Sequence, residues 1–349
     1  MRRVLFIGGG HSHVLALLRL SRRRLPNMSI KLISDSDEAP YSGMLPGFVG
    51  GQFTRRECLI NLPSLCSHVG AEWQRATAVS ADTAAARIQL QDGGDEPYDV
   101  LSINVGGAPG VPFSAPGAAT KPVMSFMDWL ESMPGAPSLA VVGAGAGGVE
   151  TALAFRRRFV ESDIALIGAS LLPGFAVRTR QKIRELMKSR NIQFHESTAD
   201  SFDNGGVVLA NGERAAATHV VFATPVCAPE WLQNTGLMLD GNGFIRVNSF
   251  LQSESVEGVF AAGDCANSGA PKSGAVAVRQ APVLADNIAA FVSGTPLSPW
   301  RTRRKLLAIL NTADGRAIAD WGGFSASGAW TWTWKKYLDE KFMSRFPSA

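Results

Sequence analysis

Short apolar runs alternate along the chain with segments of helical periodicity. The runs are rich in Val and Ile, are mostly bounded by Gly, Ser or Asp, and cover residues 4–7, 30–33, 139–142, 164–167, 220–223 and 259–262. Such runs are typical of strands that are buried on both faces of a parallel sheet. Helices are predicted over residues 13–20, 149–159 and 181–189, where apolar side chains recur at helical spacing. The pattern predicts an α/β fold.

One unit occurs twice: a strand, a glycine-rich turn, a helix and a second strand. The first copy begins at residues 4–10 and the second at residues 139–148. A duplicated nucleotide-binding fold explains this repeat most simply. We therefore predict two Rossmann-like three-layer domains, the second inserted in the first. The expected boundaries are 1–112 together with 241–298 for one domain, 113–240 for the other, and 299–349 for a small C-terminal region.

The glycine turn of the second copy has the spacing Gly143-x-Gly145-x-x-Gly148, between a predicted strand and a predicted helix. In this context the first Gly makes the tight turn, the second lets the backbone approach a pyrophosphate, and the third lets the helix pack on the strand. The helix N-terminus adds free N–H groups and positive potential. The turn therefore predicts dinucleotide binding; a purely structural glycine turn is the alternative.

The acidic residue expected about 20 residues after such a turn, where it binds the ribose of NAD, is missing. The second strand ends instead at Gly168, followed by Ala169 and Ser170. Absence of a carboxylate removes a repulsion against a 2′-phosphate, which would permit NADPH. The other interpretation is that this site has lost nicotinamide binding.

The N-terminal glycine turn is less regular. His13 stands where the third small residue of the motif belongs. His11 and His13 lie at a predicted helix N-terminus, where they could donate hydrogen bonds to phosphate; the alternative is that they are ordinary turn and cap residues. Ser34 or Asp35, at the end of the next strand, could reach a ribose.

Three later segments resemble the pyridine nucleotide-disulfide oxidoreductase superfamily. Residues 258–265 (GVFAAGDC) resemble its second FAD fingerprint, in which Asp264 would bind the ribityl chain and Gly263 would permit close approach. Residues 98–107 resemble the strand that leads into the nicotinamide domain, and residues 221–225 resemble the returning strand. Glu150, two residues after the third Gly, matches an acid that would lie near flavin and nicotinamide. These segments occur in the family's order over residues 1–295.

Within the superfamily the chain is most similar to the disulfide-free branch, which includes type-II NADH dehydrogenases and sulfide:quinone oxidoreductases. Residues 8–13, 41–47 and 278–280 resemble most closely the flavoprotein module associated with selenide, water dikinase. The resemblance implies that residues 1–112 and 241–298 bind FAD, and that residues 113–240 form an NAD(P)-binding-like domain for which NAD(P)H is a candidate cofactor.

The site residues follow from the glycine motifs and from this resemblance. Those expected at FAD are Gly8, Gly10, His11, Ser12, His13, Ser34, Asp35, Met44, Ala78, Val79, Gly106, Gly263, Asp264 and Lys272. Those expected at NAD(P) are Gly143, Gly145, Gly148, Glu150 and Gly168.

Three residues are candidates for catalysis: Lys272, Gln280 and Glu150. A flavin that accepts hydride needs positive potential at its pyrimidine edge. Lys272 and the N-terminus of the apolar helix that follows it could supply this potential, although a solvated loop lysine is an equal alternative. Gln280 resembles the glutamine that type-II dehydrogenases place near the quinone pocket.

Cysteine and charge patterns narrow the class of protein. The chain has 349 residues, four cysteines without a C-x-x-C pair, and a net charge of +4. Electrons would therefore pass from flavin directly to a small acceptor, and no metal site is predicted. Cys227 and Cys265 are expected to be buried, inert thiols. Basic clusters at residues 22–24 and 301–305 do not by themselves imply nucleic acid.

No signal peptide or stretch of about 20 apolar residues is recognised, so a cytoplasmic protein is expected. The C-terminal region contains five of the eight Trp residues. Residues 330–337 alternate aromatic and polar side chains like a half-buried strand, and a short amphipathic helix is expected after them. Trp, Tyr and Lys together suit the inner surface of a membrane; a lid over the flavin domain or a homodimer interface is the alternative.

The primary hypothesis is an FAD-dependent oxidoreductase that passes electrons from NAD(P)H to a quinone or another small acceptor. A flavin-dependent enzyme acting on a sulfur or selenium compound is the second. A flavin-binding redox sensor or partner subunit without catalysis is the third, because the acid normally found at Gly168 is absent.

Overall fold

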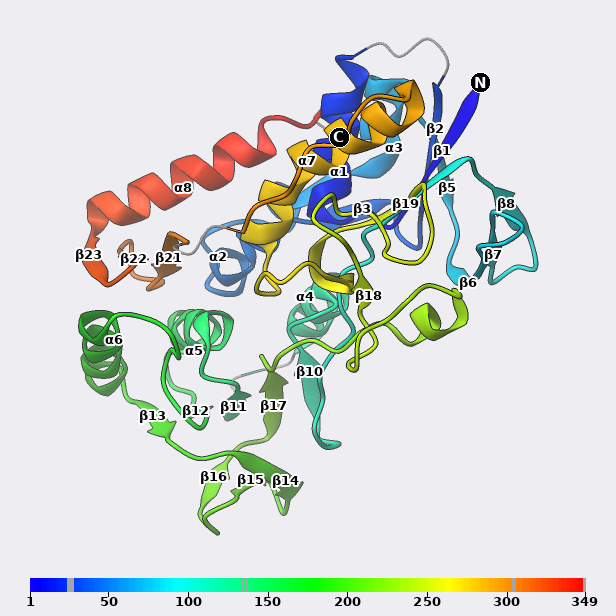
Figure 1. Cartoon of the computed structure of the whole chain (residues 1–349). Helices are drawn as coiled ribbons and strands as arrows, with labels where there is room; N and C mark the ends of the chain where they lie inside the picture. Colours follow the sequence, from blue (N-terminus) through cyan, green and yellow to red (C-terminus); the bar gives the residue numbers. More distant parts are fainter. Residues whose placement is uncertain (24–27, 134, 136, 303–305, 348–349) are drawn as a thin grey trace.

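The structure, a computed structural model, describes residues 1–23, 28–133, 135, 137–302 and 306–347. Two five-stranded parallel sheets organise it (Figure 1). The first sheet has the order β19 (Val259–Ala261), β9 (Val100–Ile103), β1 (Arg2–Ile7), β2 (Met28–Ser34), β5 (Glu72–Arg75). The chain therefore returns to this sheet after leaving it for more than 100 residues, as the sequence predicts for residues 259–262.

The second sheet is built from the middle of the chain. Its order is β10 (Gly117–Ala119), β17 (His219–Phe222), β11 (Leu139–Val142), β12 (Ile164–Ile167), β13 (Ile192–His195). All residues of β9, β11 and β12 are buried. This explains why β11 and β12 are continuous apolar runs: helices and loops cover both faces of each sheet. The predicted α/β fold with parallel sheets is confirmed.

Helices connect and cover the strands. In the first half they are α1 (His11–Ser21), α2 (Leu45–Val49), α3 (Leu62–Val69) and α4 (Val123–Ser132). In the second half they are α5 (Ala146–Arg158), α6 (Val177–Ser189), α7 (Gly274–Ser293) and α8 (Ala329–Met343). Helices α1, α5 and α6 correspond to the three predicted ones. Short 3-10 turns lie at Arg56–Cys58, Glu230–Asn234 and Gly263–Cys265.

Small sheets decorate the two units. One is antiparallel, formed by β6 (Ala78–Asp82), β7 (Arg87–Leu90) and β8 (Asp95–Pro97), and another by β14 (Ala199–Asp203), β15 (Gly206–Leu209) and β16 (Arg214–Ala216). Two-stranded pairs are β3 (Glu38–Pro40) with β4 (Leu59–Asn61), and β18 (Ile245–Arg246) with β20 (Ala266–Asn267).

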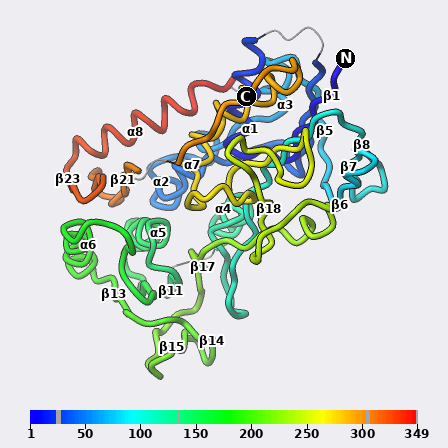
Figure 2. Tube along the Cα trace, in the orientation of Figure 1, coloured from blue at the N-terminus to red at the C-terminus, as the bar shows by residue number. Residues whose placement is uncertain are grey.

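The C-terminal region is an antiparallel sheet followed by a long helix. Its strands are β21 (Ala308–Asn311), β22 (Ala317–Trp321) and β23 (Phe324–Gly328). Figures 1 and 2 show α8 running from this sheet back to the first unit. The predicted strand over residues 330–337 is wrong, because these residues begin α8. The buried positions Thr331, Lys335, Asp339 and Phe342 follow helical spacing, but three of them are polar, so the apolar pattern did not reveal the inward face.

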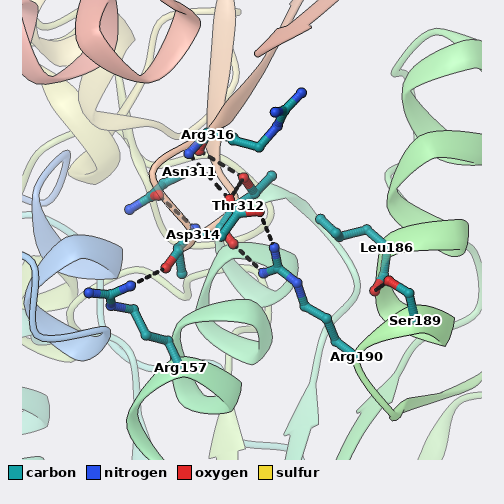
Figure 3. A network of polar contacts seen from close by, with 9 residues as sticks. Arg157, Leu186, Ser189, Arg190, Asn311, Thr312, Asp314 and Arg316 are labelled. Carbon is teal, nitrogen blue, oxygen red and sulfur yellow. Dashed lines mark hydrogen bonds and ion pairs between the residues drawn. The ribbon is translucent and has the colours of Figure 1, made fainter. Parts of the chain in front are cut away.

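A polar network fastens this sheet to the second unit (Figure 3). Arg190, after α6, donates to the Thr312 carbonyl oxygen and pairs with Asp314. Arg157 of α5 donates to the Ala313 carbonyl oxygen at 3.1 Å. Since α8 contacts the first unit, the C-terminal region bridges the two nucleotide folds.

Helix α7 is long and apolar enough, with a mean hydropathy of 1.2, to span a membrane by length and composition alone. Such a segment was not expected from the sequence. Its buried Gln280 and Asn287 make hydrogen bonds to loops of the protein, and the helix packs against α1. These contacts are those of a helix that packs within the protein.

The basic cluster at the end of α1 has a structural explanation. Arg19 and Arg23 both pair with Asp286 of α7, at 2.6 Å each. Residue 24 and residues 303–305 of the two basic clusters lie outside the described residues.

Candidate functional site

A cavity of about 540 Å³ opens at the carboxyl ends of the strands of the first sheet. Its walls come from the turns that follow β1, β2, β9 and β19, which is where open α/β sheets bind ligands. Nine of the residues expected at FAD line it: Gly8, Gly10, His11, Ser34, Asp35, Ala78, Gly106, Gly263 and Asp264.

The backbone of the β1–α1 turn has no room for side chains. Gly8 has a φ of +93°, and a Cβ on it would lie 2.6 Å from the carbonyl oxygen of Asn104. A Cβ on Gly10 would lie 2.2 Å from the Asn104 side-chain oxygen. The turn is thus a bare-backbone wall of the cavity at the N-terminus of α1, which suits an anionic pyrophosphate.

Asn104 was not singled out in the sequence, yet it organises this wall. Its Oδ1 accepts hydrogen bonds from the backbone N–H groups of Ser12 and His13, at 3.1 and 3.3 Å. Its Nδ2 donates to the Ala262 carbonyl oxygen at 2.7 Å. Asn104 therefore locks the start of α1 to the end of β19. The sequence offered one indication of this role: Asn104 has an amide side chain and directly follows the buried residues of β9.

Ser12 and His13 do not line the cavity, which corrects the expectation for both. The Ser12 hydroxyl donates to the Ala277 carbonyl oxygen at 2.7 Å. The His13 Nδ1 lies 2.7 Å from the Gly8 carbonyl oxygen, so Nδ1 carries the proton, and Nε2 accepts from the Ser102 hydroxyl at 2.8 Å. His13 replaces the small third residue of the motif because it ties the turn to β9.

This placement predicts a pH-dependent stability. Burial lowers the pKa of His13 to about 3, whereas an unfolded chain titrates near 6.5. Between these values the unfolded state binds the extra proton, so stability is lost as pH falls. From pH 7 to 5 we expect a loss of about 2 kcal/mol from His13. Urea unfolding of His13→Gln should show a shallower pH slope than wild type, with the exposed His68→Gln as control; parallel slopes would contradict this.

His11 does face the cavity. Its Nε2 accepts from the Ser42 N–H at 3.3 Å, and its ring packs edge-on against Tyr41 at 5.5 Å. Burial lowers the pKa of His11 to about 4. Asp264 raises this pKa and Lys121 lowers it, each by less than burial does. His11 is therefore neutral near pH 7. The Asp264 carboxylate, also on the cavity wall, pairs with Lys121.

Lys272 lies elsewhere, which corrects its expected role at the flavin. Its ammonium donates to the Ala266 carbonyl oxygen at 2.6 Å and stands 3.7 Å above the Phe244 ring. These partners hold it away from the cavity wall. The N-terminus of α7 does reach the wall, through Gly274 and Ala277.

Gln280 is fully buried and does not line the cavity either. Its Oε1 accepts from the Gly263 N–H at 2.7 Å and its Nε2 donates to the Ser268 hydroxyl at 2.8 Å. It thus positions the Gly263–Asp264 turn. Met44 is buried in the second hydrophobic core, and Val79 also lies off the cavity wall.

The second glycine turn has the geometry of a dinucleotide cradle. Gly143 has a φ of +115°, and a Cβ on Gly148 would lie 1.7 Å from the Gly143 carbonyl oxygen. A Cβ on Gly145 would meet only open space, at the N-terminus of α5. The absence of an acid at Gly168 has a steric reason: a Cβ there would lie 2.6 Å from that of Ala144.

Glu150 lies at the contact between α5 and the C-terminal sheet, off the wall of the first cavity. Its Oε1 accepts from the Asn311 N–H at 2.7 Å. Burial raises the pKa of Glu150 to about 7; Lys335 and the Asn311 hydrogen bond act in the opposite direction. Its carboxyl group can therefore gain or lose a proton near neutral pH.

Lys335 and Asp339 of α8 were not singled out in the sequence; Lys335 lies in the predicted strand over residues 330–337, and Asp339 lies in the short helix expected after it. Lys335 is nearly buried and donates to the Gly43 carbonyl oxygen at 2.9 Å and to Asp339 at 3.0 Å. Asp339 accepts from the Tyr41 hydroxyl at 3.2 Å. Tyr41 stacks on Phe342 at 4.0 Å. Polar contacts thus link α8 to the loop that carries Tyr41 beside His11.

All four cysteines are free thiols. Cys265 is buried, and burial raises the pKa of its thiol to about 11. Cys227 is exposed, so the expectation that it is buried is wrong. Its backbone pairs with that of Ala108, a cavity residue.

Known proteins resemble the chain over nine tenths or more of its length. Oxidoreductase ptaL of Pestalotiopsis fici is 24% identical, over 97% of this chain and 96% of the relative. NADH dehydrogenase-like protein YutJ of Bacillus subtilis is 22% identical, over 91% of each chain. The sulfide:quinone oxidoreductase of Aquifex aeolicus shares the fold, with a TM-score of 0.84, 18% identity, and coverage of 100% of this chain and 93% of that one.

The family described as pyridine nucleotide-disulphide oxidoreductase matches residues 2–281, about four fifths of the chain. This range contains both parallel sheets, both glycine turns and the Gly263–Asp264 turn. The chain therefore belongs to the pyridine nucleotide-disulphide oxidoreductase family of flavin-dependent NAD(P)H oxidoreductases.

Proposed function

We propose that this protein is an FAD-dependent oxidoreductase that transfers electrons from NAD(P)H to a quinone or another small acceptor. The observation that carries the proposal is that one chain contains two glycine turns with exposed backbone and four cysteines that form no disulfide. When bound, FAD would accept a hydride from NAD(P)H and pass its two electrons on. One NAD(P)H, one proton and one quinone would thus yield one NAD(P)⁺ and one quinol.

The residues present fit these ligands. The Gly8–Gly10 turn and the N-terminus of α1 would hold the FAD pyrophosphate, while Ser34 and Asp35 stand where the ribose binds in such folds. Gly145 and the N-terminus of α5 would hold the second pyrophosphate. Because no carboxylate follows β12, a 2′-phosphate meets no repulsion there, so NADPH is accepted alongside NADH.

Glu150 is the proposed proton donor for acceptor reduction. Burial raises its pKa to about 7, so its carboxyl group can release and regain a proton near neutral pH. Lys335 would balance the negative charge that remains on Glu150 when the proton leaves, whereas Asp339 opposes that charge.

The alternative function, oxidation of a sulfur or selenium compound, depends on a reactive thiol. Cys265 is poorly suited because it is buried and its thiol pKa is raised to about 11. Cys227 is the accessible one. Steady-state assays of NADH, NADPH and sulfide with a soluble quinone distinguish the two functions. Turnover with a nicotinamide, unchanged in Cys227→Ser, supports the proposal; turnover with sulfide alone, lost in Cys227→Ser, replaces it.

We propose that the protein acts at a membrane surface, because α8 has an exposed aromatic face. Trp330, Trp334, Tyr337 and Leu338 are 58, 38, 55 and 40% exposed and follow helical spacing. Trp321 and Phe324, which pair with each other across β22 and β23, are also exposed. Exposed Lys336 and Lys341 on the same helix favour anionic lipid.

Vesicles of anionic phospholipid should therefore bind the protein. The double variant Trp330→Glu, Trp334→Glu should bind vesicles about 100-fold more weakly. Burial of the apolar surface of each Trp in the lipid contributes about 1.4 kcal/mol or more to the free energy of binding. Met238→Glu, an exposed apolar position outside this face, is the control. Equal sedimentation of all three proteins with vesicles would contradict the proposal. Dimers that dissociate in the double variant would instead assign the face to a second copy.

A further inference from the structure

The cofactor cavity contains few positive charges. Its described wall includes the carboxylates of Asp35, Glu38 and Asp264, but Lys121 is its sole lysine or arginine. His11 is neutral, because burial lowers its pKa to about 4. Any full positive charge that the described wall offers to an anionic cofactor therefore comes from Lys121.

The sheet order shows at which end of the cavity Lys121 lies. The turns lining the cavity follow strands in the order β19-β9-β1-β2-β5, so the cavity runs along this edge. Ser34 and Asp35, after β2, mark the ribose end, and the glycine turn after β1 marks the pyrophosphate. Asp264 follows β19 at the opposite end, and Lys121 pairs with Asp264. Lys121 thus lies at the end left for the flavin.

Lys121 is also free to change partners. Its side chain is 32% exposed, and Asp264 is its one hydrogen-bond or ion-pair partner among the described residues. The preceding residue, Thr120, is anchored to the Phe222 carbonyl oxygen by its N–H at 2.9 Å and its hydroxyl at 3.2 Å. The lysine therefore extends from a fixed point on the second sheet into the cavity of the first.

We propose that Lys121 is the charged residue that stabilises the reduced cofactor relative to the oxidised one, and that it does so from the second nucleotide unit. Reduction by hydride adds negative charge to the flavin, and a nearby ammonium favours that charge. Lys272, the lysine that the sequence suggested, is held by Ala266 and Phe244 instead. This inference rests on FAD binding in the proposed function.

The test compares the two-electron midpoint potential of FAD bound to wild type, Lys121→Met, Lys121→Arg and Lys272→Met. Removing the charge should weaken the binding of reduced FAD about tenfold more than that of oxidised FAD. This ratio corresponds to a midpoint potential lower by about 30 mV. Lys121→Arg should stay within a few millivolts of wild type, and so should Lys272→Met, the matched control.

An unchanged potential in Lys121→Met overturns the inference, even if FAD binds more weakly, because uniform weakening would make Lys121 only a binding residue. A drop in Lys272→Met of the same size as in Lys121→Met also overturns it. If Lys121→Met does not fold, Lys121→Gln takes its place, and separate dissociation constants for oxidised and reduced FAD give the same ratio. A wild-type protein that binds no flavin would instead remove the proposed function.

Discussion

Gly10→Val should yield a folded protein that has lost FAD. The added Cβ would lie 2.2 Å from the Asn104 side-chain oxygen and 2.6 Å from its carbonyl oxygen. The turn must therefore shift away from Asn104, and its backbone no longer lines the pyrophosphate position. We expect FAD affinity to fall about 100-fold or more, which is about 2.7 kcal/mol. Fluorescence titration of the apoprotein with FAD measures this.

The control for Gly10→Val is a circular dichroism spectrum and NADPH binding to the second site, both of which should resemble those of the wild-type apoprotein. FAD affinity within a factor of three of wild type would contradict the assignment of this turn. A smaller loss is expected for Gly10→Ala, because only one methyl group must be accommodated.

Gly145→Val should produce the reciprocal defect: a yellow protein with normal FAD content that reacts poorly with NAD(P)H. Gly145 has an ordinary φ of −74°, and nothing lies within 4 Å of its Cβ position. The fold therefore tolerates a side chain, which would occupy the space where the pyrophosphate approaches the backbone. We expect the dissociation constant of NAD(P)H to rise about 100-fold.

Rapid reduction experiments at increasing NADPH and NADH give that constant. If the nucleotide concentrations that reduce the flavin of wild type also reduce the flavin of Gly145→Val, the second glycine turn does not bind that nucleotide. Each of the two glycine variants serves as the folding control for the other, because each should leave the opposite site intact.

The fold could be predicted because its strands are locally encoded. Each apolar run ends at a glycine or polar turn, and burial on both faces makes β11 and β12 continuous apolar runs that are recognisable from the sequence. The return of residues 259–262 to the first sheet was predicted by interpreting this run as a further strand of that sheet, and the resemblance of residues 258–265 to the second FAD fingerprint supported it. In α8 local pattern failed: alternation of Trp and Thr imitates a strand, while the inward face contains Lys335 and Asp339.

The site was predicted where backbone constrains it and missed where side chains from distant segments meet. Gly8, Gly10 and Gly263 could be placed because close backbone approach requires Gly. His13 and Lys272 could not, because their partners Ser102 and Phe244 lie far away in the sequence. Asn104 and Lys121 were missed for the same reason: each gains its role from a tertiary partner, Ala262 and Asp264 respectively.

Anaerobic mixing of the purified flavoprotein with NADH and, separately, with NADPH tests the proposed function most directly. We expect at least one nucleotide to bleach the oxidised flavin absorbance in a single turnover, and a soluble quinone added next to restore it. If neither nucleotide reduces the flavin, although dithionite does, the protein is not an NAD(P)H:acceptor oxidoreductase.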